Sequence, residues 1–486
     1  MDILKKNATQ LVQSFASNSD IEDGVITTYE VKRNLGRRHI NMIAIAGMVV
    51  GQKFLKPISR LLELTHTNYR SLEVSFRHAI RFVQPVLGIA TGWNFWYTMA
   101  IAAPAELAAA ATLIKFWDNS INPAIWYSVF IVIIVIINSC GVKVYGENEV
   151  FFSALKILLI IGLIIAGLVV DLGESPSGDQ IGFRYWKHPG PFNEFMVPGN
   201  TGKFLGFWSS LISVAYSYAN IQVVAIAGAE TKNLRVIIPN TIRMTFWPSL
   251  IFYVQNPFVI TFQRAGINVL PSIINALVCT SAFSCGSACV LLASRTLHGP
   301  AEDGQAPRVL LRTNKFGTPY LAIGASLIFT PLVYLGLGSS SSVVLEWFVN
   351  ITNIAGLIGW LAIQVTYLGF YSASKIQGIS RDRLAYKSPF QPYLAWVTGG
   401  SLVLVVLFSG HSVFFPGHWN AGTFLTYYVD IVIFVFLWDI GLCYVRSGSI
   451  ALQDVGLTEI ADVDHEKAEV VNLTEQDISW WRKWIL

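Results

Sequence analysis

The chain has 486 residues, of which 53% are hydrophobic and only 13% are charged, and its formal net charge is +4. A soluble domain has about 25% charged residues, so this composition excludes an ordinary soluble protein. No basic patch is interleaved with stacking aromatic residues, so a nucleic-acid partner is excluded as well. The composition predicts an all-α polytopic membrane protein whose surface contacts the lipid bilayer.

Two segments precede the first full apolar run. Residues 1–39 are polar and basic and lack the apolar core of a signal peptide, so we expect a cytosolic N-terminal tail. Residues 40–83 hold an apolar run at 40–51, which would be roughly 18 Å long as a helix, followed by the charged stretch 56–81. Because that length is too short to cross a bilayer, we predict a half-span there, either re-entrant or interfacial.

A transporter-like domain is expected over 84–446. About 20 apolar residues in a helix cover the ~30 Å hydrocarbon core. Ten runs meet this requirement, with Pro248 and Pro257 breaking the fifth: 84–114, 123–142, 151–171, 203–229, 244–262, 269–293, 319–338, 343–369, 393–409 and 422–445. Basic residues gather in alternate connectors, at 232–243, 295–315 and 375–387. The positive-inside rule therefore places both termini in the cytosol, including a C-terminal tail at 447–486.

An ionisable residue inside an apolar run costs at least ~2.5–3.5 kcal/mol, and we single out Glu106 and Lys156 on this ground. Glu106 lies among alanines beside Pro104, and small residues let other helices pack closely, so its carboxylate is expected to face the bundle interior. The alternative is a residue near the outer end that reaches the headgroups. Lys156 lies about one and a half turns into the run 151–171. It could extend to the interface, or it could be buried and carry a proton.

The run 203–229 contains eight hydroxyl and amide side chains near its middle: Ser209, Ser210, Ser213, Tyr216, Ser217, Tyr218, Asn220 and Gln222. Such a helix is expected to line a cavity or to unwind there. Interhelical hydrogen bonding could explain a few of these residues but not all of them. We find no metal-ligand cluster, cofactor motif or catalytic motif, and so expect neither a metal, a cofactor nor an enzyme.

Several long stretches resemble fungal amino-acid permeases of the amino acid–polyamine–organocation (APC) superfamily. The most specific are LLASRTLHGPAEDGQAPRVLLRTNKFGTPYLAI (291–323), WFVNITNIAGLIGWLAIQVTYLGFY (347–371) and GISRDRLAYKSPFQPYLAW (378–396). The resemblance extends from about residue 30 to 446. It implies an APC-type fold of twelve spans, the first ten forming two inverted five-helix repeats. It also implies a symporter in the plasma membrane that takes up an amino-acid substrate together with protons.

The resemblance also implies roles for individual residues. Tyr216 matches an aromatic gate over the substrate, and Gln222 stands where relatives usually have a glutamate, in an unwound helix that includes Tyr218. Lys156 matches a lysine that replaces a sodium ion in proton-coupled relatives, and Glu106 matches a glutamate of the third helix. Gly47 and Gly51 lie where relatives have a glycine-rich break, whose backbone amides suit the substrate carboxylate.

The chain also departs from the family pattern. The G-T-G type break of the first helix is missing, the charged stretch 56–79 stands in place of a second helix, and the seventh helix is shortened near Val254–Asn256. These departures look like deletions or a misread intron boundary, because matching sequence resumes on each side. They leave about ten spans and a half-span instead of twelve.

Two other functions stay open on the sequence. A sensor-like, non-transporting relative would not need the paired first and second helices. An importer of polyamines, choline or γ-aminobutyrate would share the architecture but accept a different amine. Competition of uptake by each compound would separate such an importer from an amino-acid importer.

Overall fold

The computed structural model describes residues 74–117, 120–172, 194–218, 270–302, 304–338, 341–378, 390, 392–445 and 453. The predicted half-span with Gly47 and Gly51, the broken span 244–262, Gln222 and most of both tails lie outside the described residues. Every regular element within the described part is a helix.

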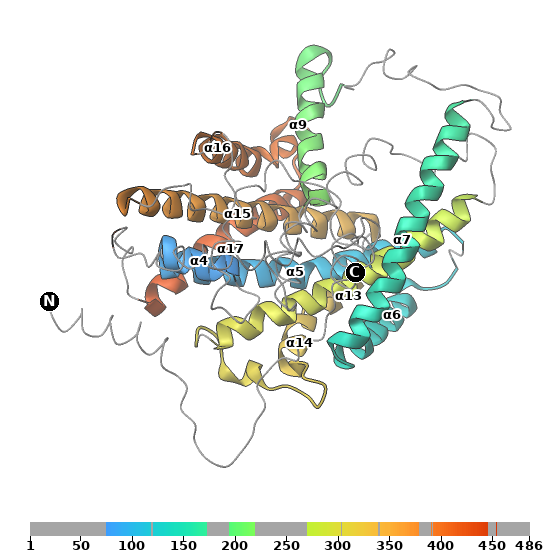
Figure 1. The fold of residues 1–486 in the computed structure, drawn as a ribbon. Helices are drawn as coiled ribbons and strands as arrows, with labels where there is room; N and C mark the ends of the chain where they lie inside the picture. Colours follow the sequence, from blue (N-terminus) through green and yellow to red (C-terminus); the bar gives the residue numbers. More distant parts are fainter. Residues whose placement is uncertain are drawn as a thin grey trace, which may run out of the picture.

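Three long helices form the centre of the bundle, and the middle one, the first of the three in the chain, packs against the other two (Figure 1). They are α5 (Pro85–Ile114), α13 (Leu270–Glu302) and α15 (Ser341–Ile376). Pro85 begins α5, where its missing N–H costs no hydrogen bond. The alanine-rich part of α5 is buried almost throughout, because small side chains let neighbouring helices approach closely.

A short helix, α4 (Val74–Phe82), precedes α5 within the region that we expected to be degenerate. The Phe82 ring packs against Phe370 of α15 with 5.3 Å between ring centroids. Gly369 brings the α15 backbone so close that a Cβ atom there would lie 2.5 Å from the Phe82 carbonyl oxygen. The end of that region is therefore packed into the bundle.

At one edge of the bundle, α6 (Pro123–Ser139) leads directly into α7 (Val142–Asp171). The Asn122 side chain caps α6 by accepting a hydrogen bond of 2.9 Å from the Ala124 N–H. Gly141, with φ of +98°, makes the turn between the two helices in a backbone conformation that other residues rarely adopt.

The start of α7 corrects one sequence prediction. The run was predicted to begin at residue 151, but the helix begins at Val142, and the span candidate extends over Lys143–Val169. The charged residues Lys143, Glu147 and Glu149 made this segment resemble a connector. Lys156 is consequently the fifteenth residue of a 30-residue helix and lies near its middle.

The remaining helices complete the described part. They are α9 (Gly199–Tyr218), α14 (Tyr320–Leu327), α16 (Tyr393–Phe408) and α17 (Ala421–Val445), with 3-10 helices at Arg308–Leu311, Thr330–Leu337 and His411–Phe414. The predicted run 319–338 is thus an α-helix followed by a 3-10 helix, which has Pro331 in its first turn. Trp208 of α9 donates a 3.3 Å hydrogen bond to the Phe408 carbonyl at the end of α16.

Six segments of the described part are long and apolar enough to cross a membrane, and α6 and α16 are shorter apolar helices of 17 and 16 residues. Together they account for eight of the ten predicted runs, while α9 covers the first part of the run 203–229. The predicted class, an all-α polytopic membrane protein, is confirmed. The total number of spans and the inverted repeat stay predictions.

Candidate functional site

Lys156 belongs to a closed polar cluster between α7 and α13. Its Nζ atom lies 3.5 Å from Glu149 Oε1 and donates a 3.1 Å hydrogen bond to Ser284 Oγ. The Ser284 hydroxyl in turn donates a 2.8 Å hydrogen bond to Glu149 Oε2. Each of the three side chains therefore contacts the other two.

The cluster is buried between two helices that are long and apolar enough to cross a membrane. The side chain of Lys156 is 12% exposed, that of Glu149 is 4% exposed, and Ser284 is 1% exposed. Glu149 lies two helical turns before Lys156, so both point from the same face of α7 towards α13. Because Lys156 lies near mid-helix and is paired, its contacts favour the buried lysine over the one that reaches the interface.

Glu106 approaches the same stretch of α13 from α5. A Cβ atom on Gly286 would lie 3.4 Å from the Glu106 Cβ, so the two helices are in close contact there. The structure thus brings two residues chosen from the sequence, on α5 and α7, to opposite sides of Ser284–Gly286.

The polar contacts continue along α13 to α6. Asn138 donates a 3.0 Å hydrogen bond to Ser287 Oγ, and both side chains are buried. Four helices, α5, α6, α7 and α13, therefore place polar side chains around residues 284–287. Polar groups at membrane depth that face other helices rather than lipid are typical of a functional region.

The other expected site residues are only partly described. The backbone of Tyr216 and Tyr218 lies in the last turn of α9. Gln222, Gly47 and Gly51 lie outside the described residues, so their arrangement relative to Lys156 stays a prediction. Within the described part, no group of three or more histidine, cysteine and acidic side chains could hold a metal ion.

A comparison with protein families decides what kind of protein carries this cluster. The model of the family described as "Amino acid permease" matches residues 69–256 and 254–449. The chain belongs to the amino acid permease family. It is therefore a multi-pass membrane transporter for amino acids and not an enzyme.

Individual relatives agree with the family assignment. The proline-specific permease of Emericella nidulans is 35% identical over 447 residues, which cover 83% of this chain and 80% of the relative. The lysine/arginine permease of Candida albicans is 32% identical over 84% of this chain and 80% of its own length. The dicarboxylic amino acid permease of Saccharomyces cerevisiae is 29% identical over 95% of this chain and 87% of its own length.

One solved structure, the Eremococcus coleocola manganese transporter, aligns with 92% of this chain and 98% of its own, at 12% identity and a TM-score of 0.43.

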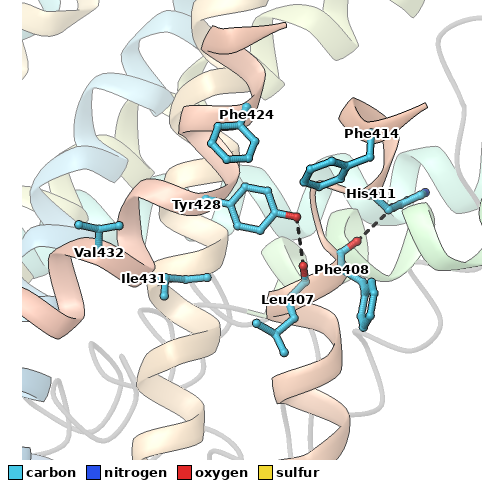
Figure 2. A pocket seen from close by; sticks show the side chains of 8 residues that line it. All are labelled: Leu407, Phe408, His411, Phe414, Phe424, Tyr428, Ile431 and Val432. Carbon is cyan, nitrogen blue, oxygen red and sulfur yellow. Dashed lines mark hydrogen bonds between the residues drawn. The ribbon is translucent and has the colours of Figure 1, made fainter. Parts of the chain in front are cut away.

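The permease also has a hollow of about 610 Å³ between the end of α16 and α17 (Figure 2). Its lining is apolar except for His411 and Tyr428, which donate hydrogen bonds to the carbonyls of Phe408 and Leu407. An amino acid carries an ammonium and a carboxylate group, and this lining cannot pair with both. None of the expected site residues lines it.

The sequence interpretation missed two members of the Lys156 cluster. Glu149 was assigned to a connector, although its spacing of seven residues from Lys156 would have placed both on one helix face. Ser284 carried no recognisable signal, because a serine within an apolar helix most often bonds to its own backbone.

Proposed function

We propose that this permease is a proton-coupled importer of amino acids in the plasma membrane that works by alternating access. The observation that carries the proposal is the buried cluster of Lys156, Glu149 and Ser284. In this proposal Lys156 and Glu149 form the proton site, and the substrate binds beside it.

The ion pair of Lys156 and Glu149 is suited to proton coupling because its stability depends on the protonation state of each side chain. A buried ammonium costs at least ~2.5–3.5 kcal/mol at membrane depth, and the Glu149 carboxylate offsets this cost. Adding a proton to Glu149, or removing one from Lys156, ends the ion pair. It also changes the hydrogen bonds that Ser284 makes with these two side chains. A proton can therefore change how α7 packs against α13, which is the kind of two-state contact that alternating access needs.

The substrate site is proposed from the sequence. Backbone amides at Gly47 and Gly51 would bind the substrate carboxylate. Gln222 and freed backbone carbonyls would bind the ammonium, with Tyr216 covering the side chain. Glu106 and Tyr218 would line the same space. In support, Glu106 already lies against Gly286, next to the proton cluster.

The relatives bear names that include neutral, acidic and basic substrates: proline, dicarboxylic amino acids, and lysine or arginine. These compounds have in common an α-carboxylate and an amine, so we propose the substrate class at the level of α-amino acids. A panel of proline, glutamate and arginine covers the three charge types.

The test is uptake of the radiolabelled panel by a yeast strain that lacks its own permeases, at about pH 5 and about pH 7. We expect faster uptake at the lower pH, and loss of this pH dependence in K156M and E149Q. The exposed residue Lys143 lies on the same helix, so K143M is the matched control and should behave as wild type.

Two outcomes would overturn the proposal. Absence of uptake of every amino acid, with the protein at the cell surface, would favour the sensor-like relative. Uptake that polyamines, choline or γ-aminobutyrate inhibit, but amino acids do not, would favour an amine importer.

A further inference from the structure

A second ionisable residue lies at membrane depth on α17, far along the sequence from the Lys156 cluster. Asp430 is the tenth residue of this 25-residue helix, within the apolar span candidate Ala421–Cys443. The residue is fully buried, with 0% of its surface exposed. A carboxyl group placed there is a functional candidate, because neither water nor lipid headgroups can reach it.

Asp430 lies next to Tyr97 of α5, whose hydroxyl acts on its carboxyl group. In the part of the chain that the structure describes, neither carboxyl oxygen has a hydrogen-bond partner, and neither forms an ion pair with a lysine, arginine or histidine. In this respect Asp430 differs from Glu149, which has a lysine.

Among the described residues, the surroundings of Asp430 and Tyr97 are polar but carry no compensating charge. Asn94, which is buried on α5 one turn before Tyr97, donates a 2.8 Å hydrogen bond to the Ala355 carbonyl of α15 and keeps its own side-chain oxygen without a partner. From α15, the carboxylate of Glu346 acts on Tyr427, one turn before Asp430, and not on Asp430 itself. Tyr97 is thus the titratable group that α5 presents to Asp430, and α15 presents none to it directly.

We propose that Asp430, which is buried beside Tyr97 between α5 and α17 with both carboxyl oxygens unpartnered, is a proton-binding site of this permease separate from Lys156. An ionised carboxylate without a cation is poorly accommodated in a buried interface, whereas the neutral acid can share a hydrogen bond with a hydroxyl. A proton from water forms an O–H bond with a carboxylate oxygen when the helices close, and this bond breaks when they separate. We infer a proton rather than a larger ligand because the helices pack closely around Asp430 and leave no part of its surface exposed.

Proton binding is tested without transport. Infrared difference spectra of the purified, full-length permease are recorded between about pH 5 and about pH 8. We expect the carbonyl stretch of a protonated, buried carboxyl to decrease as the pH rises, to be missing in D430N, and to shift in frequency in Y97F. The exposed Asp439 lies on the same helix, so D439N should keep the band. A pH-dependent carboxyl band that is unchanged in D430N, or the absence of any Asp430-dependent change, would overturn the proposal.

The use of this proton in transport rests on the proposed function. In proteoliposomes containing a pH-sensitive dye, D430N should carry fewer protons for each amino acid than wild type, while D439N should carry the same number. If the permease took up no amino acid at all, the proposed function would fail, and the infrared result would still decide whether Asp430 binds a proton.

Discussion

At the scale of single residues, the cluster of Lys156, Glu149 and Ser284 shows how a lysine can reside in the middle of a membrane helix. The carboxylate neutralises the ammonium, and the Ser284 hydroxyl bridges the two by accepting from one and donating to the other. Removing one partner leaves an uncompensated buried charge, whereas removing both leaves none. This asymmetry predicts strongly non-additive effects of substitution.

We expect K156M and E149Q each to destabilise the permease by about 3–5 kcal/mol, and the double variant to be more stable than the sum of these losses implies. The measurement is unfolding in denaturant, followed for the purified protein in detergent. E147Q, at an exposed position of the same helix, is the control and should change stability little. Losses that simply add would mean that the two charges do not interact.

The sequence identified some of these residues but not their partners. Glu106 and Lys156 stand out because an ionisable residue in an apolar run is costly. Glu149 was missed because the charged first turns of α7 resemble a connector. Asp430 was missed although the same rule applies to it: it is an acid in the middle of the run 422–445. Which helices would face these residues depends on tertiary packing, which a single sequence does not reveal.

At the scale of elements, close approach of helix backbones positions the site. Gly286 of α13 lies against Glu106 of α5, and Gly369 of α15 lies against the Phe82 carbonyl of α4. A glycine at such a contact lowers the helix propensity of its own segment. It is favourable there because the missing side chain lets the two helix backbones approach closely. Changes at these positions therefore test the packing directly.

We expect G369A to destabilise the permease by about 1–3 kcal/mol, because the new Cβ would lie 2.5 Å from the Phe82 carbonyl oxygen. The melting temperature in detergent measures the effect. A Cβ atom added at Gly400 of α16 would meet nothing within 4 Å, so G400A is the matched control and should be neutral or stabilising. Equal melting temperatures for the two variants would contradict the close packing of α4 against α15.

A graded pair of substitutions at Gly286 tests the contact with Glu106. In G286A the new Cβ makes an ordinary contact of 3.4 Å with Glu106, so uptake should be close to that of wild type. In G286L the longer side chain would displace Glu106 or separate α5 from α13. We therefore expect uptake to fall at least tenfold while the protein still reaches the membrane. Equal uptake by both variants would show that this contact does not matter for transport.

At the scale of the whole molecule, hydropathy predicted the class and the approximate positions of eight apolar helices, because the length of a membrane helix is set by the bilayer. It did not predict where helices begin when charged residues occupy their first turns, as in α7. The family match divides into two parts that meet at 254–256, and its first part begins at residue 69. Both boundaries fall in the regions where we expected the sequence to depart from the family pattern, and the deletions expected there stay predictions.

The most direct measurement is amino-acid accumulation by the purified, full-length permease in proteoliposomes, with and without a proton gradient that is acid outside. If Lys156 and Glu149 couple protons to transport, wild type should accumulate an amino acid of the panel only with the gradient. K156M should lose this accumulation but still exchange labelled for unlabelled substrate, and K143M should behave as wild type. Accumulation that is independent of the gradient, or equally gradient-driven in K156M, would contradict the account.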